Sequence, residues 1–223
     1  MNKKKTLEFM GESKLFSEFS TEECVLMEKI LKPYEKSFER NEIVYDEDEE
    51  IRCIGQIIEG QLIGEKFNFD GQAHIVHTFD AMDVIGLETI YSTKKESPVT
   101  YTAAEDTTML MFPYVAAERN TRIPPELQIK MRDNMMQILA DGSIKSLYKL
   151  EVLSKRALRC RIRTFLSIMS KKNGSGTFHI GMDREQFAQY LCVNRSALSY
   201  ELSKMQKEGL IIFDKDLFTI LNL

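Results

Sequence analysis

The stretch Met182–Ile211 carries the side chains with the clearest chemical purpose, and it reads MDREQFAQYLCVNRSALSYELSKMQKEGLI. If a helix begins after Asn194, the apolar Leu198, Leu202 and Met205 fall at i, i+4 and i+7 and share one side. The opposite side then carries hydroxyls, a phenol and two cations: Arg195, Ser196, Ser199, Tyr200, Ser203 and Lys204. Such a face offers donors and acceptors to base edges and phosphates without the apolar area of a protein interface, so we expect it to bind double-stranded DNA.

The residues around this face predict the elements that hold it. Asp183 followed by Gln186 forms a capping box for a first helix, and Asn194 can cap the second after a corner at 192–194. After Gly209, the run LIIFDKDLFTIL predicts two strands joined by a short charged turn. Helix, corner, helix and a two-stranded wing describe a winged helix-turn-helix, which we place in residues 154–223.

Charge separates the chain into two parts. Residues 155–223 hold 12 Lys and Arg against 6 Asp and Glu, a balance of +6, whereas residues 1–154 hold 18 against 28, a balance of −10. A basic C-terminal part favours a polyanion as partner, and an acidic remainder discourages non-specific binding elsewhere on the surface.

The N-terminal part has a different pattern of predicted secondary structure. Thr21, Glu22 and Glu23 predict the start of a helix that ends before Pro33. From about 37 to 113, short β-favouring runs alternate with glycines, and Asp70–Gly71 predicts a hairpin turn. We therefore expect an α+β protein in which residues 1–124 form an antiparallel β-roll, or jelly roll, with flanking helices.

A long helix is predicted at residues 125–153. It would extend roughly 42 Å at 1.5 Å per residue, more than a compact domain of this size needs. We expect two copies of the helix to pair in a homodimer; packing of the whole helix onto its own β domain is the alternative. The apolar side predicted for pairing comprises Met135, Ile138, Leu139, Gly142, Leu147 and Leu150.

Several functional classes are not expected. The first residues contain no apolar core of a signal peptide, and no apolar run is long enough to cross a membrane, so we expect a cytoplasmic protein. The three histidines stand apart from any nucleophile elbow or phosphate loop, so we expect no enzyme and no catalytic residues. The four cysteines form no CxxC pair; we expect reduced, mostly buried thiols and no metal site.

Four features together resemble the Crp/Fnr superfamily of bacterial transcription regulators. They are Ile57–Gly86 (IIEGQLIGEKFNFDGQAHIVHTFDAMDVIG), the predicted long helix, Ala157–Leu166 (ALRCRIRTFL) and the helical corner described above. The resemblance implies a homodimer with a sensory β-roll that controls DNA affinity through a small-molecule effector, and RNA polymerase as a further candidate partner. It also implies an effector pocket that includes Gly86, Leu87, Glu88, Ser97 and Pro98.

Departures from the family bear on the effector. In cyclic-nucleotide-binding members, a Glu holds the ribose and an Arg-Ser pair holds the phosphate, but here Leu87 and Ser97–Pro98 stand at those positions. Without a guanidinium we do not expect cyclic AMP, although Lys94 and Lys95 remain candidates for an anionic effector. The effector therefore stays unknown.

Metal cofactors known in the family are not expected either. Cys24 is the one cysteine in the first 50 residues, too few thiolates for the N-terminal iron–sulfur cluster of some members. His74 and His77 are three apart on a predicted strand and point to opposite faces, which disfavours a shared metal site. Haem ligation by His77 is a less favoured alternative to an ordinary half-buried histidine.

The predicted recognition helix departs from the family as well. Arg195 matches the guanine-reading arginine of the family, whereas Ser196 stands where many members have Glu and Tyr200 where many have a second Arg. We therefore predict a half-site that differs from the usual family sequence. The alternative hypothesis is a ligand-sensing or protein-interaction module whose DNA-binding domain is vestigial.

Overall fold

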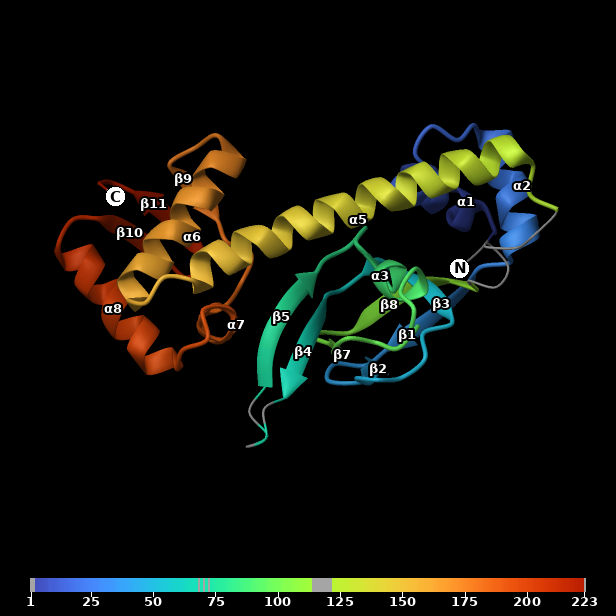
Figure 1. Cartoon of the computed structure of the whole chain (residues 1–223). Helices are drawn as coiled ribbons and strands as arrows, with labels where there is room; N and C mark the ends of the chain where they lie inside the picture. Colours follow the sequence, from blue (N-terminus) through green and yellow to red (C-terminus); the bar gives the residue numbers. More distant parts are fainter. Residues whose placement is uncertain (1–2, 68, 70, 72, 114–121, 223) are drawn as a thin grey trace. The chain divides into compact units, whose positions relative to one another are not determined.

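The computed structural model describes the chain except for residues 1–2, 68, 70, 72, 114–121 and 223 (Figure 1). Asp70 of the predicted hairpin turn thus lies outside the described residues. The chain forms two compact units, residues 1–66 with 76–142 and residues 67–75 with 143–223. This division differs from the three segments expected at 1–124, 125–153 and 154–223, because the border falls inside the long helix.

The first unit begins with three short helices: α1 (Lys3–Glu12), the 3-10 helix η1 (Lys14–Phe16) and α2 (Thr21–Leu31). Helix α2 starts at Thr21, but its cap is Ser20, one residue before the Thr21 that the sequence suggested as cap. The Ser20 hydroxyl accepts from the backbone N–H of Glu23, and the Glu23 carboxylate accepts from the backbone N–H of Ser20. This capping box satisfies two amide groups that a helix start would otherwise leave unpaired.

Two four-stranded sheets form the β-roll. One has the order β1 (Tyr34–Phe38), β8 (Thr107–Pro113), β3 (Cys53–Glu59) and β6 (Val84–Ile85), and the other the order β2 (Ile43–Tyr45), β7 (Thr100–Ala103), β4 (Leu62–Phe67) and β5 (Ala73–Phe79). Neighbouring strands pair antiparallel, for example β3 with β8. Buried side chains from both sheets, including Ile57, Leu62, Tyr101 and Met109, make one core. The predicted α+β class is confirmed.

The long helix α5 (Pro125–Leu153) has the bounds predicted from the sequence. Its first half packs on the helices of its own unit: Leu127, Met131 and Met135 are buried in a core that also contains Met27 of α2. Lys130 forms an ion pair with Glu23 at 2.9 Å. This part of α5 is therefore fixed to the β-roll domain.

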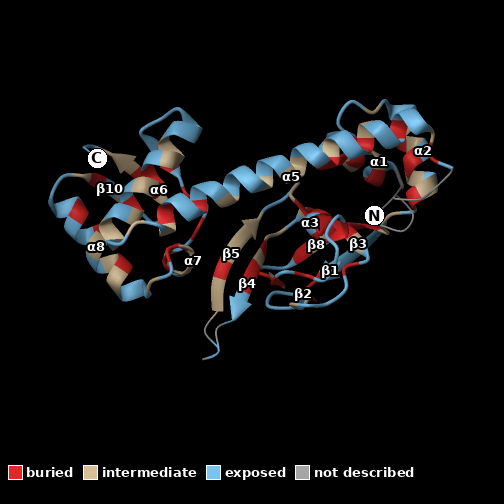
Figure 2. Cartoon of the chain, in the orientation of Figure 1, coloured by how far each residue is buried: buried red, intermediate tan, exposed pale blue. Residues whose placement is uncertain are grey.

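The apolar side predicted for helix pairing needs correction. Met135 is 3% exposed, and Ile138 and Leu139 pack against the core of their own unit. Leu147 and Leu150 are 61% and 64% exposed, and Ile129 and Met136 are 49% and 62% exposed. Figure 2 shows the ribbon of α5 mostly in the colour of exposed residues. The physical reason is helical geometry, because the twelve residues from Met135 to Leu147 equal three and a third turns. The two residues therefore face different directions.

The second unit contains the predicted helix-turn-helix and wing. Its elements are α6 (Leu158–Asn173), β9 (Thr177–His179), α7 (Arg184–Tyr190), α8 (Arg195–Lys207), β10 (Ile211–Asp214) and β11 (Leu217–Ile220). The wing strands β10 and β11 pair antiparallel, and β9 extends them to a three-stranded sheet. No helix in the described part of the chain combines the length and apolar content needed to span a membrane.

Candidate nucleic-acid interface and effector region

Helices α7 and α8 are capped as the sequence predicts. The Asp183 carboxylate accepts from the backbone N–H of Gln186 at 2.8 Å, and the Gln186 side chain accepts in return from the backbone N–H of Asp183 at 2.8 Å. The Asn194 side-chain oxygen accepts from the backbone N–H of Ala197 at 2.8 Å. Cys192 in the corner has a positive φ of 54°. These bonds fix where α8 begins and thus which residues form its first turn.

Burial along α8 divides its side chains as expected. Leu198, Leu202 and Met205 are 0% exposed and pack in the core of the second unit with Phe187 of α7. The predicted DNA-binding residues lie on the remaining surface: Arg195, Ser196, Tyr200, Ser203 and Lys204 are exposed, and Ser199 is half-buried. The structure thus brings all six predicted residues together on one helix.

Arg159 of α6 connects α6 to α8 through hydrogen bonds to two carboxylates. Its guanidinium donates to Glu201 at 2.5 Å and to both carboxylate oxygens of Glu208 at 2.6 and 3.1 Å. These hydrogen bonds raise the pKa of Arg159 further above its usual value. Sequence reasoning missed this cluster because its members are more than 40 residues apart. These hydrogen bonds tie α8 to α6 without using any of the six predicted DNA-binding residues.

The wing tip carries acidic residues. The Asp216 carboxylate accepts a hydrogen bond from Nδ1 of His179 in β9 at 3.0 Å, and Asp214 ends β10. Arg184 of α7 stacks on the ring of Phe213 at 4.8 Å, and burial lowers its pKa. The exposed Lys215 lies between the two aspartates, so the tip carries charges of both signs.

The first three predicted effector residues lie at the start of α3 (Leu87–Ile90). Gly86 has a φ of 89°, a conformation that favours glycine. Leu87 is 1% exposed and belongs to the core shared with α5. Glu88 is exposed and accepts a hydrogen bond from the hydroxyl of the buried Tyr101. An internal tyrosine therefore already engages the one carboxylate of this group.

Ser97 and Pro98 are poorly suited to hold a phosphate. The buried Ser97 donates its hydroxyl to the carbonyl of Val99 at 2.6 Å and its backbone N–H to the carbonyl of Glu49 at 2.8 Å. Pro98 has no N–H to donate and is exposed. Both donors of Ser97 are thus used within the protein, one inside its own loop and one with the segment between β2 and β3, so neither is available to a phosphate in this structure.

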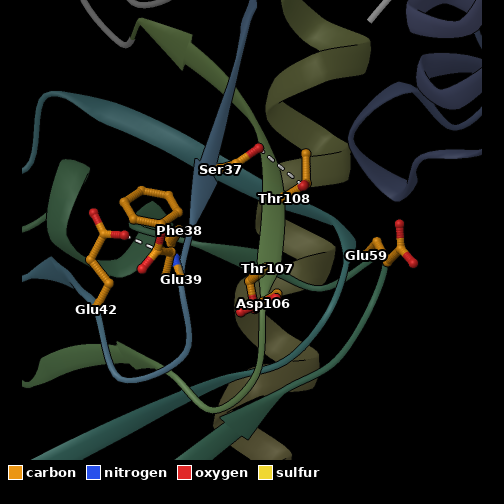
Figure 3. Close-up of a pocket in the computed structure, with 8 residues that line it drawn as sticks. All are labelled: Ser37, Phe38, Glu39, Glu42, Glu59, Asp106, Thr107 and Thr108. Atoms are coloured by element: carbon orange, nitrogen blue, oxygen red, sulfur yellow. Dashed lines mark hydrogen bonds between the residues drawn. The ribbon is translucent and has the colours of Figure 1, made fainter.

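A pocket in the β-roll has an acidic lining. Its residues come from the end of β1 and the turn after it, the end of β3 and the start of β8 (Figure 3): Ser37, Phe38, Glu39, Glu42, Glu59, Asp106, Thr107 and Thr108. Two of the carboxylates already accept backbone N–H groups, Glu42 from Glu39 and Asp106 from Arg40. The predicted effector residues are not part of this lining. Four carboxylates disfavour an anionic ligand here.

Lys149 near the end of α5 is a buried cation that sequence reasoning missed. It is 8% exposed, donates to the carbonyl of Ile75 at 2.5 Å and lies over the ring of Tyr190 at 4.2 Å. Burial lowers its pKa to about 8. The carbonyl and the aromatic face are the contacts that offset the cost of burying this charge.

The cysteines and histidines do not assemble into a metal site within the described residues. Cys24 is buried and Cys53 half-buried, but Cys160 and Cys192 are exposed, so the expectation of mostly buried thiols was wrong for these two. Cys192 is exposed because it lies in the corner before α8, where the chain turns at the surface. His77 packs beside Phe79, with ring centroids 6.0 Å apart.

Two protein families match the sequence. Residues 35–119 match the family described as cyclic nucleotide-binding domain, and residues 160–223 match the Crp-like helix-turn-helix domain. Together the two matches span about two thirds of the chain. No curated protein matches the sequence.

Solved structures share the fold at low sequence identity. FixK2 from Bradyrhizobium japonicum is 20% identical with a TM-score of 0.66, covering 84% of this chain and 92% of its own. The cyclic di-GMP-responsive regulator CLP from Xanthomonas campestris is 14% identical with a TM-score of 0.70, covering 89% and 99%. A mutant of CooA from Carboxydothermus hydrogenoformans is 18% identical with a TM-score of 0.66, covering 98% and 92%.

Proposed function

The chain belongs to the Crp/Fnr family of transcription regulators, and we propose that it acts in the cytoplasm as a homodimer that binds a specific DNA sequence under control of an effector sensed in the β-roll. The observation that carries the proposal is the division of α8. Its apolar side is fully buried, while Arg195, Tyr200 and Lys204 stand exposed on a helix that is capped at its start. A helix of this kind fits the major groove, where base edges present donors and acceptors.

Dimerisation is supported by the exposed apolar residues of α5. Ile129, Met136, Leu147 and Leu150 recur at spacings of seven, eleven and three residues, which keeps them near one side of a continuous helix. Exposed apolar stripes of this length favour pairing with a second helix. Two recognition helices would then address half-sites about 34 Å apart, one turn of B-DNA.

We propose that the effector is not cyclic AMP. The donors of Ser97 bond the carbonyls of Val99 and Glu49, and the Glu88 carboxylate is engaged by Tyr101. The effector must bind the DNA-competent and the incompetent arrangement with different affinity, because equal affinity would shift nothing.

DNA binding is tested by a gel-shift titration at several salt concentrations, after selection of a preferred duplex from a random pool. We expect one enriched palindromic sequence and a logarithm of the binding constant that falls linearly and steeply with the logarithm of salt concentration. Failure to enrich any sequence, with no salt-dependent retention, would favour the ligand-sensing or protein-interaction module with a vestigial DNA-binding domain.

A further inference from the structure

We infer that Tyr200 determines specificity by placing its ring against the 5-methyl group of a thymine in each half-site. This inference rests on the proposed function, because it names what one outward residue of α8 recognises on the DNA. The chemical group that it names, the 5-methyl group, can be removed from the duplex without any other change.

Tyr200 occupies the middle of the outward side of α8. Its side chain is 71% exposed, although a tyrosine ring has more apolar surface than any other outward residue of this helix. Its neighbours one turn away on this side are the small Ser196 and Ser203 and the long, flexible Lys204. The two serines leave the ring open to solvent, where it can contact a base edge.

The hydroxyl hydrogens of the two flanking serines are already used in hydrogen bonds within the protein. Ser196 donates to the side-chain oxygen of Asn194 at 3.0 Å, and Ser203 donates to the backbone carbonyl of Ser199 at 2.8 Å. In this arrangement they offer lone pairs to the DNA and no proton. Arg195 in the first turn remains the strong donor, suited to the two acceptors of a guanine. Tyr200 is left as the large apolar group of the face.

Thymine is the base that complements such a group. In the major groove its 5-methyl is the apolar feature of the natural base pairs, whereas the other base edges present donors and acceptors. A neutral ring cannot make the bidentate contact that an arginine makes with guanine. Tyr200 lies five residues after Arg195, about 7.5 Å along the helix, which places the thymine within roughly two base pairs of the guanine.

The experiment uses the full-length protein and its selected duplex. Each thymine is replaced in turn by deoxyuridine, symmetrically in both half-sites, and affinities are measured by fluorescence anisotropy for wild type, Tyr200→Ala, Tyr200→Phe and the control Lys204→Ala. At one thymine we expect methyl removal to weaken wild-type binding about fourfold per half-site, or about 15-fold for both. Tyr200→Phe and Lys204→Ala keep this ratio, and Tyr200→Ala brings it close to one.

The outcomes separate this inference from the proposed function. A wild-type protein that tolerates deoxyuridine at every position, or a Tyr200→Ala variant that still discriminates, overturns the thymine contact while specific DNA binding stands. Loss of discrimination in Tyr200→Phe also overturns it, since the hydroxyl and not the ring would then read the base. Absence of any preferred duplex overturns the proposed function and the inference together. Circular dichroism checks that the variants fold, as expected for an exposed position.

Discussion

The hydroxyl of Tyr101 in β7 donates a 2.5 Å hydrogen bond to the carboxylate of Glu88 in α3. Tyr101 is 1% exposed, and its ring lies 5.6 Å from that of Phe79, so it fills the interior of the β-roll. Burial, followed by the neighbouring carboxylate, holds the pKa of Tyr101 above its usual value. One side chain thus joins the core of the roll to the short helix where the effector residues were predicted.

Tyr101→Phe should lower the free energy of unfolding at pH 7 by about 1–2 kcal/mol, because a hydrogen bond to a charged acceptor is lost. The pKa is raised in the folded state, so the tyrosine's contribution is present below about pH 10 and is lost as pH rises further. The gap between wild type and Tyr101→Phe should therefore close above pH 10. Urea titrations at pH 7 and pH 11 measure it, with the exposed Tyr200→Phe as control. A gap that persists at pH 11 would contradict the argument.

For Lys149→Met, the difference in stability from wild type should change with pH in the opposite direction to that for Tyr101→Phe. The pKa of Lys149 is about 8 in the folded state and about 10.4 when unfolded, so the unfolded chain binds more protons between these values. Wild-type stability should therefore rise relative to Lys149→Met as pH increases from 8 to 10. Urea unfolding at pH 7, 8.5 and 10 measures the difference, with the exposed Lys171→Met as control. A difference in stability between wild type and Lys149→Met that does not change with pH would contradict this prediction.

Leu147→Glu should produce a monomer. Leu147 is 61% exposed, and a carboxylate in its place would have to be buried without a partner in a helix pair. We expect light scattering after size-exclusion chromatography to give half the wild-type mass and the gel shift to weaken at least tenfold. Asp141→Ala, an exposed change on another side of α5, should leave both unchanged. A Leu147→Glu protein that remains dimeric would refute the assignment of this side.

Arg195→Ala and Lys204→Ala should weaken DNA binding in different ways. Loss of Arg195 should cost about 1–3 kcal/mol on the selected duplex and relax specificity at one base pair. Loss of Lys204 should weaken all sequences alike and reduce the salt slope by about one, as expected for a phosphate contact. Anisotropy titrations with selected and random duplexes distinguish the two. Equal losses on both duplexes for Arg195→Ala would rule out base reading by this residue.

The sequence by itself determined the helix-turn-helix. Asp183 with Gln186 and Asn194 with the following turn are signals within four residues, and the period of Leu198, Leu202 and Met205 states which side of α8 is buried. Local hydrogen bonds and helical spacing are encoded in neighbouring residues, so they can be read without the fold. The bounds of α5 were predictable for the same reason.

Tertiary structure alone decided which apolar residues of α5 remain free and which polar groups meet. Helical spacing already shows that Met135 and Leu147 face different directions, but only the packing of α1 and α2 against the first half of α5 decides that Met135 is buried. The contacts of Lys149 with Ile75 and of Arg159 with Glu208 join residues far apart in sequence. Such pairs depend on how distant segments pack, and burial then sets their energies, so composition and spacing could not predict them.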